Sequence, residues 1–496
     1  MMTVAHERRM KAGCLKTSYF WAKLRNNMSP TQKVTGQGPI DVSDLIEARP
    51  LGRFQIGVFL LCALACFASG FNDLALGYVA PNVAESLRVS AGALGPAFAV
   101  LGAGNVLGVL ICGPLADRFG RKPVMIGAML ASTPFVLATA AVHSVAQLAV
   151  IQLLASIGLM GVMPVALALA GEYAPRSRKV TIVLIVFVGF ALGTIVSGIA
   201  AAGVTQSHSW RYLFVISGML PCLIAPVLLW RLPESLHVLV QRGVSDDRVA
   251  RIVGLLAPAD ASLTGRHVVV AEKNEHGFPV WLLFREGRAL TTSLLWLMFF
   301  ANVMLVMVLN SWLTTILTSA GMARHSAIIV ASAVNLGGLI GAVAFALVYD
   351  RLRRFGFFIL SGAFFCGACF VVATGYVHGS VALVAATVLL AGFFAYGAQS
   401  TANAVAATQY PTAMRSTGGS WAFGVGQIAR VIGPVTAGVL LSLGWGEARM
   451  LTVIAVPGFI AAVAAALIGI AGRGAVLQRV APVGQTFETR GAAKVV

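Results

Sequence analysis

Long apolar runs constrain this chain more than any other feature of its sequence. About twelve of them follow one another, each close to the roughly twenty residues that a helix needs to cross a bilayer. Hydrophobic residues make up 58% of the 496 residues and charged residues only 11%, whereas a soluble protein carries about a quarter charged residues. The sequence therefore predicts an all-α polytopic membrane protein and argues against a soluble enzyme.

The apolar runs form two groups of six. Residues 1–50 are expected to be an N-terminal tail, 51–231 a six-helix bundle, 232–288 a polar central loop, 289–472 a second six-helix bundle and 473–496 a C-terminal tail. The expected spans are 54–80, 91–115, 123–142, 146–171, 180–202 and 211–231, then 290–319, 326–349, 356–376, 380–407, 416–443 and 449–471.

Basic residues predict the orientation of these spans. The net charge of the chain is +18. Its basic residues are concentrated in alternate short loops, whereas each of the other loops carries mainly a single basic residue. Because cytoplasmic loops are enriched in Lys and Arg, both tails and the central loop are expected in the cytoplasm, with the chain in the inner membrane. This distribution suits contact with anionic lipid better than binding of nucleic acid.

The two halves also resemble each other in sequence. The segment 113–118 after the second span matches 346–351 after the eighth, and 172–178 after the fourth matches 409–415 after the tenth. Repeated helix bundles are how many secondary transporters achieve alternating access. The sequence therefore favours a transporter with two similar six-helix halves.

One loop motif resembles the signature GxxxDRxGR[RK] of the major facilitator superfamily, at the position between the second and third spans where that family has it. The resemblance implies the major facilitator fold and a set of residues that hold the cytoplasmic side shut in one conformation. The alternative is that these charges only set topology. The expected gating residues are Gly113, Asp117, Arg118, Gly120 and Arg121, with Asp350, Arg351, Arg178 and Arg415 from the repeated segments.

Within that superfamily, several segments resemble the aromatic acid:proton symporters, which import benzoate-like acids. These are Met163-Pro164 leading into Glu172-Tyr-Ala-Pro, Trp210-Arg211, Leu232-Pro-Glu-Ser-Leu236, Ser311-Trp-Leu313 and Tyr410-Pro-Thr-Ala-Met-Arg-Ser-Thr-Gly418.

Two positions depart from that family's pattern. Where its first span has Asp-Gly-x-Asp, this chain has Ser69-Gly-Phe-Asn72, with Asp73 following. Where its eleventh span has Gly-x-Gly-Arg, this chain has Gly424-Val-Gly-Gln427, with Arg430 one turn later. The charges appropriate to proton and carboxylate handling are therefore displaced along the chain.

Asp73 and Arg430 are the ionisable residues deepest within the spans, where a charge costs several kcal/mol unless it has a partner. Asp73 is predicted to couple proton movement, and the alternative is a solvated carboxylate near the end of a span closed by Pro81. Arg430 is predicted to bind a substrate carboxylate with help from Gln427, and the alternative is a structural pair with a carboxylate or with carbonyls. Further candidates for the cavity wall are Asn335, Trp312, Gln399 and Asn403.

The function predicted from these patterns is import of a small organic anion, expected to be an aromatic carboxylate, by proton symport. Proton-coupled efflux of drugs or metabolites is an alternative, as is a membrane sensor that transports nothing. No nucleotide-binding, catalytic or metal-binding motif is present in the sequence, so the proton gradient is the expected energy source and no cofactor or metal is expected. A monomer could perform this function.

Overall fold

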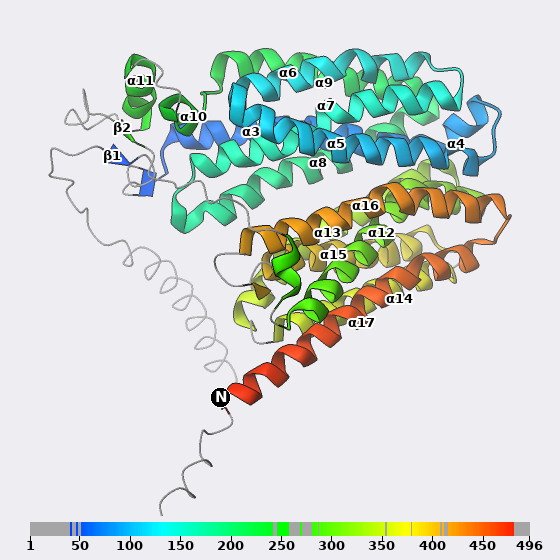
Figure 1. Cartoon of the computed structure of the whole chain (residues 1–496). Coiled ribbons are helices and arrows are strands. Elements are labelled where there is room, and N and C mark those ends of the chain that lie inside the picture. Colours follow the sequence, from blue (N-terminus) through cyan, green and yellow to red (C-terminus); the bar gives the residue numbers. More distant parts are fainter. Residues whose placement is uncertain are drawn as a thin grey trace, which may run out of the picture.

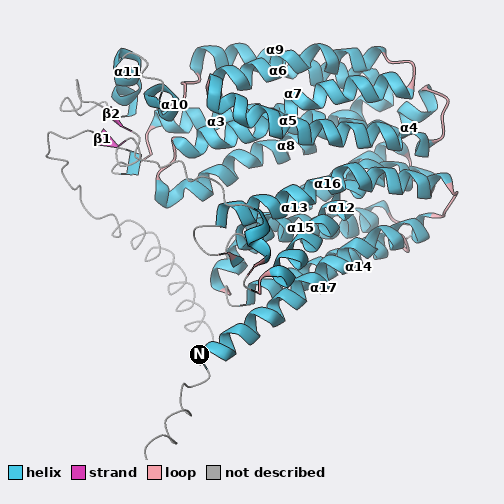
Figure 2. Ribbon diagram, in the orientation of Figure 1, coloured by secondary structure: helices cyan, strands magenta, loops and turns pink. Residues whose placement is uncertain are grey.

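The computed structural model is almost entirely helical (Figures 1 and 2). It describes residues 40–41, 46–47, 51–241, 246–256, 268–269, 280–285, 287–352, 355–377, 379–406, 409–410 and 415–480. The N-terminal helices are α3 (Arg53–Asp73), α4 (Ala75–Ser86), α5 (Gly95–Phe119), α6 (Arg121–Ala138), α7 (Val145–Glu172), α8 (Lys179–Ser207) and α9 (Arg211–Arg231). The C-terminal ones are α12 (Ala289–Ser319), α13 (Arg324–Arg351), α14 (Gly356–Thr374), α15 (Val381–Ala406), α16 (Arg415–Ser442) and α17 (Glu447–Val480).

Within the described residues, twelve helical segments are long and apolar enough to cross a membrane, with α3 and α4 together forming the first. This confirms the predicted all-α fold. Helices α3 to α9 form one half and α12 to α17 the other, one above the other in Figure 1. The central segment adds α10 (Leu236–Gln241) and α11 (Asp246–Leu256) at one end of the first half. We call this end the α10 end and the opposite end the α4 end.

Short elements connect or cap the long helices. They are the 3-10 turns η1 (Ala91–Leu94), η2 (Thr139–Ala141), η3 (Arg176–Arg178) and η5 (Val280–Phe284). A two-residue parallel pair joins β1 (Ile40–Asp41) to β2 (Val268–Val269), which links the segment before the first half to the central segment. Three apolar residues of α11, Val249, Ile252 and Val253, pack into the core of the first half.

Glycine repeats hold neighbouring helices together within each half. A Cβ on Gly189 or Gly193 of α8 would lie 2.2 Å from a carbonyl oxygen of α3, and one on Gly341 of α13 would lie 2.1 Å from the carbonyl oxygen of Phe393 in α15. Such separations are possible only without a side chain, and close backbone approach is how many membrane helices associate. These glycines therefore form packing surfaces between neighbouring helices.

The two halves share a core at only one end. One buried apolar cluster contains residues of both halves, including Val79, Leu94 and Phe98 with Leu309 and Trp312. Toward the α10 end, each half has a separate cluster of its own. The halves are thus packed together from the middle of the molecule to the α4 end.

Polar contacts between the halves follow the same distribution. Arg324 pairs with Glu85 at 2.5 Å, and Nδ1 of His325 lies 3.2 Å from the carbonyl oxygen of Ala202. Deeper in the molecule, the Asn335 amide donates to the Tyr78 hydroxyl at 3.2 Å. All three contacts belong to the α4 end, which is closed in this conformation.

Replacing Gly341 by leucine should disrupt the packing of α13 on α15. The matched control is Gly362→Leu, because a Cβ at Gly362 meets no atom of the described residues within 4 Å. Overpacking costs about 1–3 kcal/mol or more, so Gly341→Leu should lower the thermal unfolding temperature in detergent while the control changes it little. Equal melting temperatures for the two variants would contradict the packing role.

Candidate functional site

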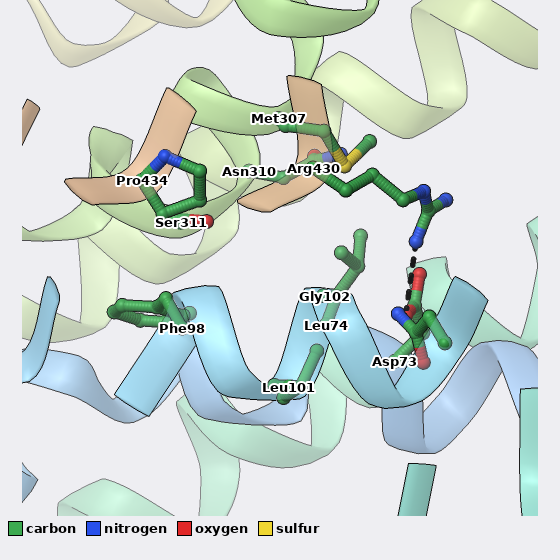
Figure 3. Close-up of a pocket in the computed structure, with 12 residues that line it drawn as sticks. Asp73, Leu74, Phe98, Leu101, Gly102, Met307, Asn310, Ser311, Arg430 and Pro434 are labelled. Atoms are coloured by element: carbon green, nitrogen blue, oxygen red, sulfur yellow. Dashed lines mark hydrogen bonds and ion pairs between the residues drawn. The ribbon is translucent and has the colours of Figure 1, made fainter. Parts of the chain in front are cut away.

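A buried ion pair joins the two halves near the middle of the molecule. Nη1 of Arg430 in α16 lies 3.5 Å from Oδ1 of Asp73 at the end of α3, and the Asn105 amide of α5 donates to the same oxygen at 2.6 Å (Figure 3). The side chain of Arg430 is only 14% exposed and that of Asp73 only 6%. The two ionisable residues that the sequence places deepest in the spans are therefore partners.

Local breaks in helix geometry place these charges. Helix α3 ends at Asp73 and α4 begins at Ala75, so the first span is interrupted at Leu74, and Pro81 lies inside α4. The expectation that Pro81 closes the first span is wrong, because the helix continues for five residues beyond it. Asp73 accordingly lies at an interior break of the first span, where its side chain is only 6% exposed.

Arg430 sits beside a second irregularity. Pro434 lies inside α16 and has no N–H, so it cannot close the helical bond to the carbonyl of Arg430. Gly102 of α5 faces that carbonyl, and a Cβ there would lie 2.5 Å from its oxygen. A glycine therefore lets the backbone of the first half approach the backbone that carries the arginine.

The ion pair lines a small pocket between the halves, part of which is open to the outside. The first half contributes the acceptor Asp73, with the amide of Asn105 beside it. The second half contributes the cationic donor Arg430. The remaining lining is largely apolar: Leu74, Gly77, Phe98, Leu101, Gly102, Met307, Asn310, Ser311 and Pro434.

The other predicted cavity residues lie outside this lining. Gln427 is half-buried one turn closer to the α10 end of α16. Trp312 is fully buried and donates from Nε1 to the carbonyl oxygen of Pro434 at 2.9 Å. Asn335 bonds to Tyr78, while Gln399 accepts from Asn302 at 2.6 Å and donates to Asn403 at 3.4 Å.

Three polar lining residues were not among the sequence candidates for substrate binding. They are Asn105, Asn310 and Ser311, of which only Ser311 appears in the sequence analysis, as part of the motif Ser311-Trp-Leu313. Their positions relative to the pocket depend on helix rotation, which a nearly uniformly apolar span does not reveal.

A second polar network lies at the α10 end of the first half. Gly120 has a positive φ of 104°, which turns the chain between α5 and α6. Oε1 of Glu234 accepts from the backbone N–H groups of Arg121 at 2.8 Å and Lys122 at 3.2 Å, and so caps α6. Arg121 also bonds to Glu172 at 3.1 Å and to Asp117 at 2.7 Å.

Two expected gating residues of this loop motif lie at the α10 end, where the halves have separate cores. The Asp117 side chain is 67% exposed and pairs with Arg121, while the Glu234 carboxylate occupies the N-terminus of α6. A Cβ on Gly113 would meet no described atom within 4 Å. The role of both residues in closing this end stays a prediction.

Burial supports the donor role of a tyrosine in this network. Burial, and then the charges of Glu172 and Glu234, raise the pKa of Tyr173 well above its usual value, so its hydroxyl stays protonated. It donates to the carbonyl oxygen of Glu234 at 2.6 Å, while the Tyr173 carbonyl accepts from Gln55 at 2.9 Å. The network therefore fixes the ends of α3, α6 and α7 together.

The remaining predicted gating residues lie at the same end. Arg118, Arg178 and Arg351 are exposed, and the guanidinium of Arg118 lies 5.4 Å from the centre of the Phe119 ring. The backbone of Asp350 lies in the last turn of α13 and that of Arg415 begins α16, but their side chains are outside the described part of the structure.

Comparison with known proteins agrees with this architecture. Residues 62–434 and 295–483 match the Major Facilitator Superfamily. The chain belongs to this superfamily. It is therefore a transporter and not an enzyme, and transport in this superfamily requires no cofactor. Among the described residues, no group of three or more His, Cys, Asp or Glu could hold a metal ion.

Named relatives of this transporter cover nearly its whole length. It is 35% identical to the 4-hydroxybenzoate transporter PcaK of Pseudomonas putida, over 88% of this chain and 97% of the relative. It is 32% identical to the gallate transporter of the same organism, over 86% and 94%. The structure of a D-xylose-proton symporter matches with a TM-score of 0.63 at 15% identity, covering 83% of this chain and 97% of that one.

Removing the cap carboxylate should destabilise the first half of this transporter. Glu234→Ala removes the acceptor for two N–H groups at the start of α6 and should cost about 0.5–2 kcal/mol, whereas Glu234→Gln keeps an oxygen and should cost less. Thermal unfolding in detergent measures both. Glu47→Ala is the control, because its carboxylate makes one exposed 3.3 Å bond to Ser177. A melting temperature for Glu234→Ala equal to that of the control would exclude the capping role.

Proposed function

We propose that this transporter imports an aromatic carboxylate together with a proton, by alternating access of its two halves. The observation that carries this proposal is the buried Asp73–Arg430 pair, which lies in a largely apolar pocket between the halves. An arginine binds a carboxylate bidentately, and apolar walls suit an aromatic ring. The named relatives that transport 4-hydroxybenzoate and gallate support the same substrate class.

We assign the transporter to the inner membrane, with its α10 end on the cytoplasmic side. Clusters of basic residues, including Arg118, Arg121 and Lys122, lie at this end, while the α4 end carries mainly single ones such as Arg88 and Arg324. The positive-inside bias supports this assignment. Both termini then lie in the cytoplasm.

With this sidedness, the closed α4 end faces outward and the conformation is inward-facing. Outward opening requires the contacts of Glu85 with Arg324 and of Tyr78 with Asn335 to separate. It also requires the α10 ends to come together, where Gly113, Asp117 and the other predicted gating residues would meet the second half. Rocking of two bundles about a central site is a common form of alternating access.

Competition for Arg430 couples the proton to the anion. Arg430 contacts Asp73 at 3.5 Å, which is long for a charged hydrogen bond, and a guanidinium has five N–H donors. A substrate carboxylate can therefore replace Asp73 as the partner of Arg430. The released Asp73 would leave a buried negative charge, so it must take a proton, while Asn105 still holds its Oδ1.

The test is uptake of radiolabelled 4-hydroxybenzoate by cells or proteoliposomes under an imposed proton gradient. Asp73→Asn should abolish the protonophore-sensitive accumulation of substrate. It should preserve the exchange of labelled for unlabelled substrate, because asparagine imitates the protonated acid. Arg430→Gln should lower apparent affinity about ten- to hundredfold and impair both assays, because it removes a charged hydrogen bond to the substrate.

Arg449→Gln is the matched control for the arginine variant. It removes the same charge from the α4 end, where the guanidinium lies 5.6 Å from the centre of the Trp445 ring and outside the pocket. Its uptake should remain near that of the wild type. Accumulation by Asp73→Asn that still responds to the protonophore would exclude Asp73 as the coupling group, and accumulation only in the outward direction would favour efflux.

A further inference from the structure

Two polar side chains of the pocket, Asn310 and Ser311, have no use in the coupling described above, and the Asn310 amide already donates to Tyr396. Ser311 of α12 is half-buried and lines the pocket. Many serine and threonine hydroxyls in the described helices donate to a carbonyl three or four residues earlier, as Thr318 does to Thr314 at 2.7 Å. The Ser311 hydroxyl, in contrast, makes no hydrogen bond to any described residue. It is therefore available to a ligand.

The neighbours of Ser311 hold it firmly in place. Trp312 donates to the Pro434 carbonyl oxygen at 2.9 Å, and its ring meets Phe98 edge-on with centroids 5.1 Å apart. On the other side, the Asn310 amide donates to the hydroxyl of Tyr396 in α15. Because Trp312 ties α12 to α16, the position of Ser311 relative to Arg430 is fixed within the second half.

Ser311 and the ion pair lie toward opposite ends of the pocket. Figure 3 shows Ser311 beside Pro434, on the side of Phe98, while the guanidinium of Arg430 points to Asp73 on the other side. Phe98 and Asn105, which mark these two ends on α5, are separated by seven residues or about 10 Å of helix. Leu101, Leu74 and Met307 lie between these ends, and the amide of Asn310, which also lines the pocket, donates to the Tyr396 hydroxyl. This length and polarity fit a single aromatic ring with a polar group at each end.

We infer that Ser311 determines specificity by hydrogen bonding to a hydroxyl on the substrate ring, opposite the carboxylate held by Arg430. This rests on the proposed transport of aromatic carboxylates and adds which of them the site selects. A hydroxyl that meets Ser311 gains a hydrogen bond, whereas an unsubstituted ring leaves the serine without a partner. Sites built to bond a substrate hydroxyl discriminate strongly against the analogue that lacks it.

The experiment compares initial uptake of radiolabelled 4-hydroxybenzoate and benzoate, each over a range of concentrations, by wild type and Ser311→Ala. In the wild type, the ratio of maximal rate to KM should be about tenfold higher for 4-hydroxybenzoate than for benzoate. Ser311→Ala should lower this ratio for 4-hydroxybenzoate alone, so that the values for the two acids come within about twofold of each other. Unchanged benzoate uptake shows that the variant is folded.

Thr315→Val is the matched control. Thr315 lies one turn further along α12, and its buried hydroxyl also has no partner among the described residues, but it is outside the pocket lining. This variant should keep the wild-type preference. An equal loss for both substrates in Ser311→Ala, or a wild type without preference for the hydroxylated acid, overturns the inference. If wild type takes up neither acid, the proposed function itself fails.

Discussion

The ion pair between Arg430 and Asp73 is the interaction on which the rest of this structure depends. A charge within a membrane span costs several kcal/mol unless it has a partner, and each half supplies only one of the two charges. Neither half can therefore satisfy its own charge at this depth. The halves must therefore stay in contact at this depth, or a proton must neutralise Asp73 and an anion must replace it as the partner of Arg430.

The packing around the pair follows from this constraint. On the α4 side, glycines bring the backbones of the halves into contact, as Gly102 does with Arg430 and Gly77 with Asn310. On the α10 side, each half closes its own core, and Glu234 and Tyr173 hold the helix ends of the first half together without the second. The pair lies where the shared core gives way to separate ones.

Much of this could be predicted from the sequence, for identifiable reasons. The number of spans follows from local composition, and Asp73 and Arg430 are conspicuous because charges are rare in apolar runs. Their pairing joins residues 357 positions apart and depends on how the halves dock. The cap by Glu234 was missed for the same reason, because it joins residues 113 positions apart. The break at Leu74 was missed because the local signal for a helix end is Pro81, seven residues later.

The pocket also divides its chemistry between the halves. The cation and the serine hydroxyl belong to the second half, whereas the carboxylate belongs to the first. Under the proposed function, the anion is held by one half and the proton by the other, so neither ligand alone restores neutrality across the interface. An anion without a proton leaves Asp73 charged and unpaired, and a proton without an anion leaves Arg430 so. Only the loaded or the empty carrier is neutral at this depth, which is the physical requirement for tight coupling.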